Sequence, residues 1–218
     1  MSETSLPKTP ERGWVARFWQ IPTRRGWGVF VVLLAVAAYF AFVAFDDRKA
    51  ELNRLVSEDS GGKTTSVSAP DVQMWRYDAG WLRNFAQNLP EGKEARRYFI
   101  RSQRRLDILF PIVYGFMFAV GIAAGWEYVR ARRTCPARPL HDARWLLLPP
   151  VLAVVFDYAE NETVIWLLGL PPDQWPLWLA NAAGWFTVVK WLLSFLSFVI
   201  LVVGGVWAFR VCLKEPKT

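Results

Sequence analysis

Four polar residues that could do chemistry interrupt an apolar stretch at 145–170 close to its middle, which predicts mid-membrane depth if this stretch crosses a bilayer. They are Asp157, Glu160, Asn161 and Glu162. Carboxyl and amide groups at this spacing could bind a cation, a proton or a small ligand, and two carboxyl groups could also work as general acid and base. Because a charged carboxylate is costly in an apolar environment, the sequence predicts that these acids have either partners or a function.

Helical spacing divides the four residues into two groups. At about 100° per residue, Asn161 lies about 40° to one side of Asp157 and Glu160 about 60° to the other side. These three side chains therefore share one face. Glu162 lies about 140° from Asp157, so it is expected to face a different neighbour or lipid.

Lys190 is the natural partner for this face. It is the one charged residue of the apolar stretch 177–209, and a short link joins that stretch to 145–170. Neighbouring helices with a short connection pack antiparallel, so we expect Lys190 to pair with Asp157 or Glu160. The candidates for further partners are Asn181, Ser194, Tyr114 and Tyr39. One lysine cannot neutralise three acids, so at least one acid should be protonated, open to water or bound to a cation.

Three interpretations of this polar centre remain open. The favoured one is a binding site for a lipid-like ligand, a cation or a proton. The second is an acid/base enzyme that acts on a lipid. The third is a structural or assembly protein whose buried ion pair only fixes helix packing.

The elements that must position these residues are long and apolar. Stretches without charge, or interrupted only by the residues above, cover 27–45, 108–126, 145–170 and 177–209. About 20 apolar residues cross a bilayer as a helix. The sequence therefore predicts an all-α, polytopic membrane protein: a four-helix transmembrane bundle over 26–210, with an extracytoplasmic helical loop at 46–107 and tails at 1–25 and 211–218.

The distribution of Lys and Arg predicts the orientation. Basic residues crowd the N-terminal tail, the connection 127–144 and the C-terminal tail, whereas the connection 171–176 has none. Since basic short flanks stay in the cytoplasm, both termini should be cytoplasmic and the long loop 46–107 external. The net charge of +7 is then a topology signal for a multi-pass protein of the cell inner membrane, and nucleic acid is not an expected partner.

The external loop has its own predicted helices. The first span should continue through Asp47 to Val56, and Asp78 should cap a short helix that Pro90 ends. The next helix begins near Glu91 and runs into the second span. Its arginines next to aromatic residues suggest anchoring of lipid headgroups. The candidates for this role are Arg97, Arg101, Arg104 and Arg105.

Composition excludes several classes of site. Two cysteines, Cys135 and Cys212, and the single His141 cannot form a Cys/His metal site or a haem site, and no cofactor is expected. The expected partners are the lipid bilayer and a lipid or small amphiphile. Gly121 and Gly125 form a Gly-x-x-x-Gly pair, for which packing within the chain is favoured and a homodimer is the alternative.

Three motifs resemble those of a group of small bacterial four-span membrane proteins. They are LPEGKEARRY from Leu89 to Tyr98, LDILFPIVYG from Leu106 to Gly115, and FDYAEN from Phe156 to Asn161. The resemblance covers about residues 72–195 and implies a topology more than an activity. In layout alone, the chain is also similar to the sterol-isomerase and sigma-2-receptor superfamily, where intramembrane acids contact a ligand amine or transfer protons.

Overall fold

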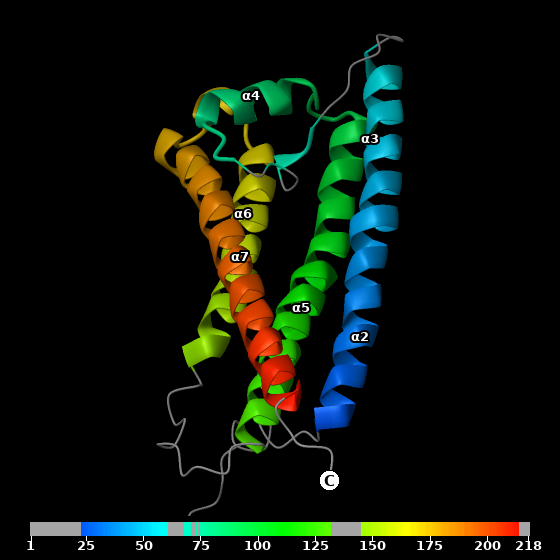
Figure 1. Cartoon of the computed structure of the whole chain (residues 1–218). Helices are drawn as coiled ribbons and strands as arrows, with labels where there is room; N and C mark the ends of the chain where they lie inside the picture. The colour runs from blue at the N-terminus through cyan, green and yellow to red at the C-terminus, as the bar shows by residue number, and fades with distance from the viewer. Residues whose placement is uncertain (1–22, 61–67, 71–72, 74, 132–144, 214–218) are drawn as a thin grey trace, which may run out of the picture.

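All regular secondary structure in the described part of the chain is helical. The computed structural model describes residues 23–60, 68–70, 73, 75–131 and 145–213 (Figure 1). Within these ranges there are helices and turns but no strand, which confirms the predicted all-α class. Most of the predicted tails and of the connection 127–144 falls outside the described residues.

The first apolar segment forms one long rod. Helix α2 (Thr23–Tyr39) passes through the π-helical turn η1 (Phe40–Ala44) into α3 (Phe45–Asp59). A π turn takes up one extra residue without ending the helix, so the rod continues. The predicted extension beyond the span is confirmed, and it reaches Asp59. One face of α3 is buried through Leu52, Leu55 and Val56.

The predicted short external helix is also present, as α4 (Ala79–Gln87). The Asp78 carboxylate accepts a hydrogen bond from the Trp81 backbone N–H at 2.8 Å, which caps the helix as expected. Gly92, with φ +75°, turns the chain into the next helix. That helix, α5 (Glu94–Ala131), is 38 residues long and runs through Pro111 into the second apolar segment.

The last two long helices form an antiparallel hairpin. Helix α6 (Leu148–Leu168) connects through the 3₁₀ turn η4 (Pro172–Gln174) to α7 (Leu177–Leu213). These helices pack along each other, α5 packs against both, and the α2–α3 rod packs mainly on α5 (Figure 1). The long helix α5 is therefore a neighbour of all the other long helices, and its Phe99 also packs on Phe85 of α4.

Small residues allow the long helices to approach closely. A methyl group on Gly115 would lie 2.3 Å from Val154 of α6, and one on Gly121 would lie 2.8 Å from both Phe30 of α2 and Leu201 of α7. Gly125 faces the backbone of α7 at Gly204. Gly121 and Gly125 thus serve packing within the chain. The homodimer through the same pair stays an untested prediction.

Within the described residues, three helical segments are long and apolar enough to cross a membrane. They are Gly26–Asp59, Glu94–Glu127 and Leu177–Trp207. The α6 helix is not among them, because three acids interrupt its 21 residues. The predicted count of four spans thus depends on α6.

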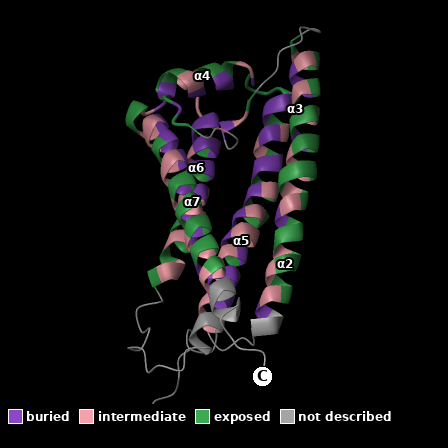
Figure 2. Ribbon diagram, in the orientation of Figure 1, coloured by how far each residue is buried: buried purple, intermediate pink, exposed green. Residues whose placement is uncertain are grey.

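The hydrophobic core lies at the end of the molecule where α3, α4 and the ends of α5, α6 and α7 meet (Figure 2). Phe99 of α5, Leu82 of α4 and Leu167 of α6 are fully buried there. Away from this end, α2 and α7 expose apolar side chains over much of their length. Such a surface is costly in water and natural in lipid.

Candidate functional site

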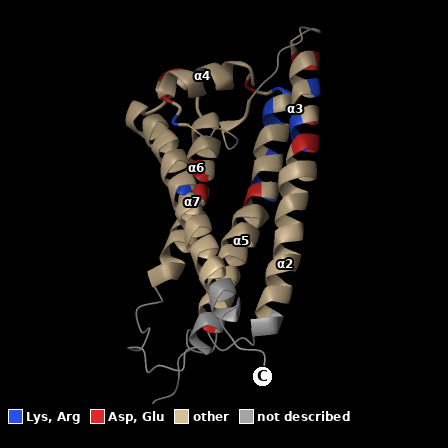
Figure 3. Ribbon diagram, viewed as in Figure 1, with Lys and Arg blue, Asp and Glu red and all other residues tan. Residues whose placement is uncertain are grey.

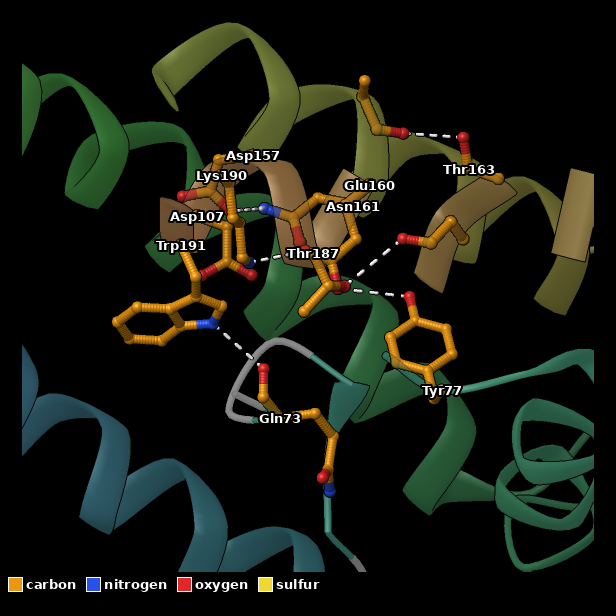
Figure 4. Close-up of polar contacts among 12 residues, drawn as sticks. Gln73, Tyr77, Asp107, Asp157, Glu160, Asn161, Thr163, Thr187, Lys190 and Trp191 are labelled. Carbon is orange, nitrogen blue, oxygen red and sulfur yellow. Dashed lines mark hydrogen bonds and ion pairs between the residues drawn. The ribbon is translucent and has the colours of Figure 1, made fainter. Parts of the chain in front are cut away.

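The predicted pairing of Lys190 with the acids of α6 is present in the structure (Figure 4). The Lys190 Nζ lies 2.9 Å from Asp157 Oδ1 and 2.5 Å from Glu160 Oε2. All three side chains are buried, and Glu160 has no exposed surface. The lysine therefore bridges two carboxylates and joins α7 to α6.

Hydroxyl groups occupy the remaining carboxylate oxygens. Thr187 and Tyr77 both donate to Glu160 Oε1, at 2.5 and 3.1 Å (Figure 4). The Tyr114 hydroxyl of α5 donates to Asp157 Oδ2 at 3.1 Å, as the sequence suggested. Since every carboxylate oxygen of the pair has a partner from the chain itself, the burial cost of the two acids is offset without a ligand.

The polar contacts continue from this cluster to the opposite side of the bundle. Asn161 donates to Asp157 and accepts a hydrogen bond from Gln103 of α5 at 2.9 Å. Gln103 in turn accepts one from Arg48 of α3, and Arg48 lies 3.6 Å from Asp107 of α5. One connected set of polar side chains, the buried network, therefore joins α3, α5, α6 and α7.

The charge deficit that the sequence suggested persists at the pair itself. Among the described residues, Lys190 is the one cation within ion-pair distance of Asp157 and Glu160, so one positive charge faces two carboxyl groups. Arg48 lies near Asp107 instead, and Arg96 donates to the Leu168 carbonyl oxygen. Glu162 does not join the network; its side chain is exposed, as its angle on the helix predicted.

The segment that precedes α4 packs on α7 next to the network. A methyl group on Gly184 of α7 would lie 1.9 Å from the Tyr77 carbonyl oxygen, so the segment touches α7 backbone to backbone. Asn181 of α7 accepts a hydrogen bond from the Ala79 N–H, and the Trp191 indole donates to the Gln73 carbonyl at 3.0 Å (Figure 4). These contacts hold the Tyr77 hydroxyl on Glu160.

The network lies at one end of the apolar stretches. Runs of 19 residues without charge occur at 27–45, 108–126 and 191–209, each about 28 Å long as a helix. Arg48 follows the first, Asp107 precedes the second and Lys190 precedes the third. Charged residues of the described helices gather accordingly toward the end where α3 and α4 lie (Figure 3).

This placement changes one sequence-based expectation. Within 145–170 alone the acids are near the middle, and the sequence therefore suggested mid-membrane depth. Asn161 contacts Gln103, which precedes the apolar run of α5, whereas Asp157 contacts Tyr114, the seventh residue of that run, so the acids extend from the end of the run into its first two turns. Of α6, only residues 148–156, about 13 Å of helix, precede the acids.

The four predicted anchoring arginines lie together on the outer face of α5. With Ile100, they line a groove of about 430 Å³. The arginines are Arg97, Arg101, Arg104 and Arg105, and all four are exposed. No acid among the described residues forms an ion pair with any of them. We call this feature the arginine groove.

Four residues of the network were not predicted from the sequence. They are Arg48, Tyr77, Gln103 and Thr187. A usable signal existed for Arg48, because it lies within one helical turn of the end of its apolar run, and Asp107 directly precedes the next run. The contact of Tyr77 with Glu160 could not be predicted from the sequence, because the two residues are 83 positions apart.

The described residues contain no group of three or more His, Cys, Asp or Glu side chains that could hold a metal ion. Known proteins add no further assignment: no protein-family model, curated protein or solved structure matches this chain. The resemblance to four-span bacterial proteins thus stays a prediction, and the function has to be argued from the geometry.

Proposed function

We propose that this chain is a four-span protein of the cell inner membrane that binds an anionic lipid on the outer side, through the arginine groove. Both termini lie in the cytoplasm in this proposal, and the α3–α4 end is external. The observation that carries the proposal is a groove lined by four exposed arginines next to an apolar run.

The membrane placement has support from the lengths of the apolar runs. Three runs of 19 residues, about 28 Å each, match a hydrocarbon core of about 30 Å. In this placement the buried network lies at the outer boundary, and the exposed Glu162 faces headgroups and water. The basic tails lie on the inner side, as the rule for basic flanks requires.

The arginines suit a phosphate-bearing headgroup. A guanidinium group donates two parallel hydrogen bonds to a phosphate, so arginine is favoured where phosphate is recognised. Arg105 lies three residues before Ile108, the first residue of the apolar run. The groove therefore extends outward from the boundary, which is the level of the headgroups.

The surface below the groove favours a lipid over a soluble anion. Ile108, Leu109 and Ile112 follow the arginines along α5, and each exposes more than half of its surface. At helical spacing, Arg101, Arg105, Ile108 and Ile112 form one stripe. The arginines at one end of this stripe complement an anionic headgroup, and the isoleucines at the other end complement its hydrocarbon chain.

The buried network has a structural role in this proposal. It connects α5 to α3, α6 and α7, and so fixes the rotation of α5 that presents the groove. A ligand site in the centre, or an acid/base enzyme, would need a free carboxylate near a substrate. Asp157 and Glu160 are instead buried and engaged by groups of the same chain.

The test is mass spectrometry of the lipids that copurify with the protein. We expect anionic lipids to be enriched on the wild-type protein relative to the bulk membrane. A variant with Arg97, Arg101, Arg104 and Arg105 changed to Gln should lose the enrichment. A charge-matched control changes four exposed basic residues outside the groove to Gln: Lys49, Arg54, Arg76 and Lys93.

The outcomes separate the three interpretations. Equal loss in both quadruple variants would mean that general charge attracts the lipid, and it would refute the groove. If Asp157→Asn rather than the groove variant removes a bound lipid, the ligand site lies in the centre. A copurifying lipid that is converted by the wild type and not by Asp157→Asn would support the enzyme.

A further inference from the structure

We infer that the lipid bound by the arginine groove carries two phosphate groups. This inference rests on the proposed function and names the class of its ligand. Four arginines line a single groove of about 430 Å³, which is within the usual range for a small-ligand site, about 300–1,000 Å³.

The charge of the groove exceeds what one phosphate neutralises. A lipid phosphodiester has one negative charge and two charged oxygens, and one guanidinium group can engage both oxygens. A single phosphodiester would leave three arginines facing one another without compensation. No described acid pairs with these exposed arginines, so a ligand with a second negative charge complements the groove better than a single phosphodiester does.

The spacing of the arginines indicates two positions for phosphate. Arg104 and Arg105 lie at the lower end, next to the apolar stripe. Arg97 lies eight positions earlier, about 12 Å along the helix, and Arg101 lies about midway. One phosphate on Arg104 and Arg105 and a second on Arg97 and Arg101 would use all four arginines.

Two lipid chemistries supply two phosphates on one molecule. In the first, two phosphodiesters are joined by a glycerol, as in cardiolipin. In the second, a diphosphate ends a single hydrocarbon chain. The shared chemistry is a lipid anchor with two phosphates, and the separation of the arginines over about two helical turns favours the first.

The experiment is a lipid titration of the purified full chain in a neutral detergent, followed by native mass spectrometry. Four probes are used: dioleoyl phosphatidylcholine as the neutral baseline, dioleoyl phosphatidylglycerol, tetraoleoyl cardiolipin and farnesyl diphosphate. At equal phosphate concentration, we expect one cardiolipin per chain, bound about tenfold more tightly than phosphatidylglycerol, because a second charge-assisted contact is made.

Single variants test the two positions. Arg97→Gln should weaken cardiolipin binding about tenfold and leave phosphatidylglycerol binding within about twofold, because the lower position remains. Arg105→Gln should weaken both. Lys93→Gln, a basic residue one turn before the groove, is the control and should change neither.

Each unfavourable outcome has a distinct meaning. If cardiolipin and phosphatidylglycerol bind equally, or if two phosphatidylglycerol molecules bind per chain with the affinity of one cardiolipin, the two-phosphate inference is wrong and the proposed function stands. Tighter binding of farnesyl diphosphate than of cardiolipin assigns the diphosphate source. If no anionic probe exceeds phosphatidylcholine, the proposed function itself fails.

Discussion

Glu160 is the residue whose surroundings constrain the centre most. It has no exposed surface, and its two oxygens contact Lys190, Thr187 and Tyr77. A carboxylate in such a place is stable only while each of its partners is present. Lys190 is the partner that matters most, since it forms ion pairs with both Glu160 and Asp157.

Lys190→Met tests this dependence. Removal of the lysine leaves two buried carboxylates without their cation, so the free energy of unfolding should fall by about 3–5 kcal/mol. Adding Asp157→Asn and Glu160→Gln should recover most of the loss, because neutral side chains can keep the hydroxyl contacts. Steric trapping in bicelles provides the measurement.

The matched control for this variant is Lys93→Met, which removes an exposed lysine and should change the free energy of unfolding by less than about 0.5 kcal/mol. An equally small effect of Lys190→Met would mean that water reaches the carboxylates. In that case the structural role of the buried network would be wrong.

At the residue scale, the sequence predicted the ion pairs between α6 and α7, the two helices of the hairpin. Lys190 with Asp157 and Glu160 followed from short sequence separation, and Tyr114 was a correct further partner. The contacts of Arg48 and Gln103 could not be predicted, because they depend on how far α5 slides along α3 and α6. That register is set by close packing, for example of Gly115 against Val154.

At the scale of elements, the helices themselves were predictable and their vertical alignment was not. Asp78 as a cap, Pro90 as an end and the continuity of α5 follow from local chemistry. The depth of the acids does not, because it requires Asn161 to be matched with Gln103 on another helix. Tyr77 reaches Glu160 only because the segment before α4 rests on α7 at Gly184.

Gly184→Ala tests this contact between elements. The new methyl group would meet the Tyr77 carbonyl oxygen at 1.9 Å, so the segment has to move away from α7. We expect a loss of about 1–3 kcal/mol in the free energy of unfolding, with faster amide hydrogen exchange over residues 77–82.

Gly205→Ala on the same helix is the control, because nothing lies within 4 Å of its added methyl group. It should be neutral or stabilising by up to about 1 kcal/mol, since alanine favours helix more than glycine does. If amide hydrogen exchange over residues 77–82 is unchanged in Gly184→Ala, the packing of this segment on α7 is contradicted.

At the scale of the whole molecule, the buried network and the arginine groove belong to the same end. Both lie where the three charge-free runs of 19 residues stop, and the hydrophobic core lies beyond them. In the proposed membrane placement, the network holds α5 in place close to the headgroups and the apolar surface beyond it faces lipid. Both features then lie at the outer boundary rather than at mid-membrane depth.

Cysteine accessibility along α5 tests this placement and the orientation together. In a background with Cys135→Ser and Cys212→Ser, single cysteines replace Arg101, Arg105, Leu109 or Ile112, all of which are exposed. In intact cells, a membrane-impermeant maleimide should label positions 101 and 105 strongly and position 112 not at all, because Ile112 lies about 10 Å along the helix from Arg105 and about 6 Å inside the apolar run that begins at Ile108. Absence of labelling at 101 and 105 even in permeabilised cells would return the acids to mid-membrane depth. Labelling of these two positions only after permeabilisation would reverse the orientation, and the arginine groove would then face lipids of the inner leaflet.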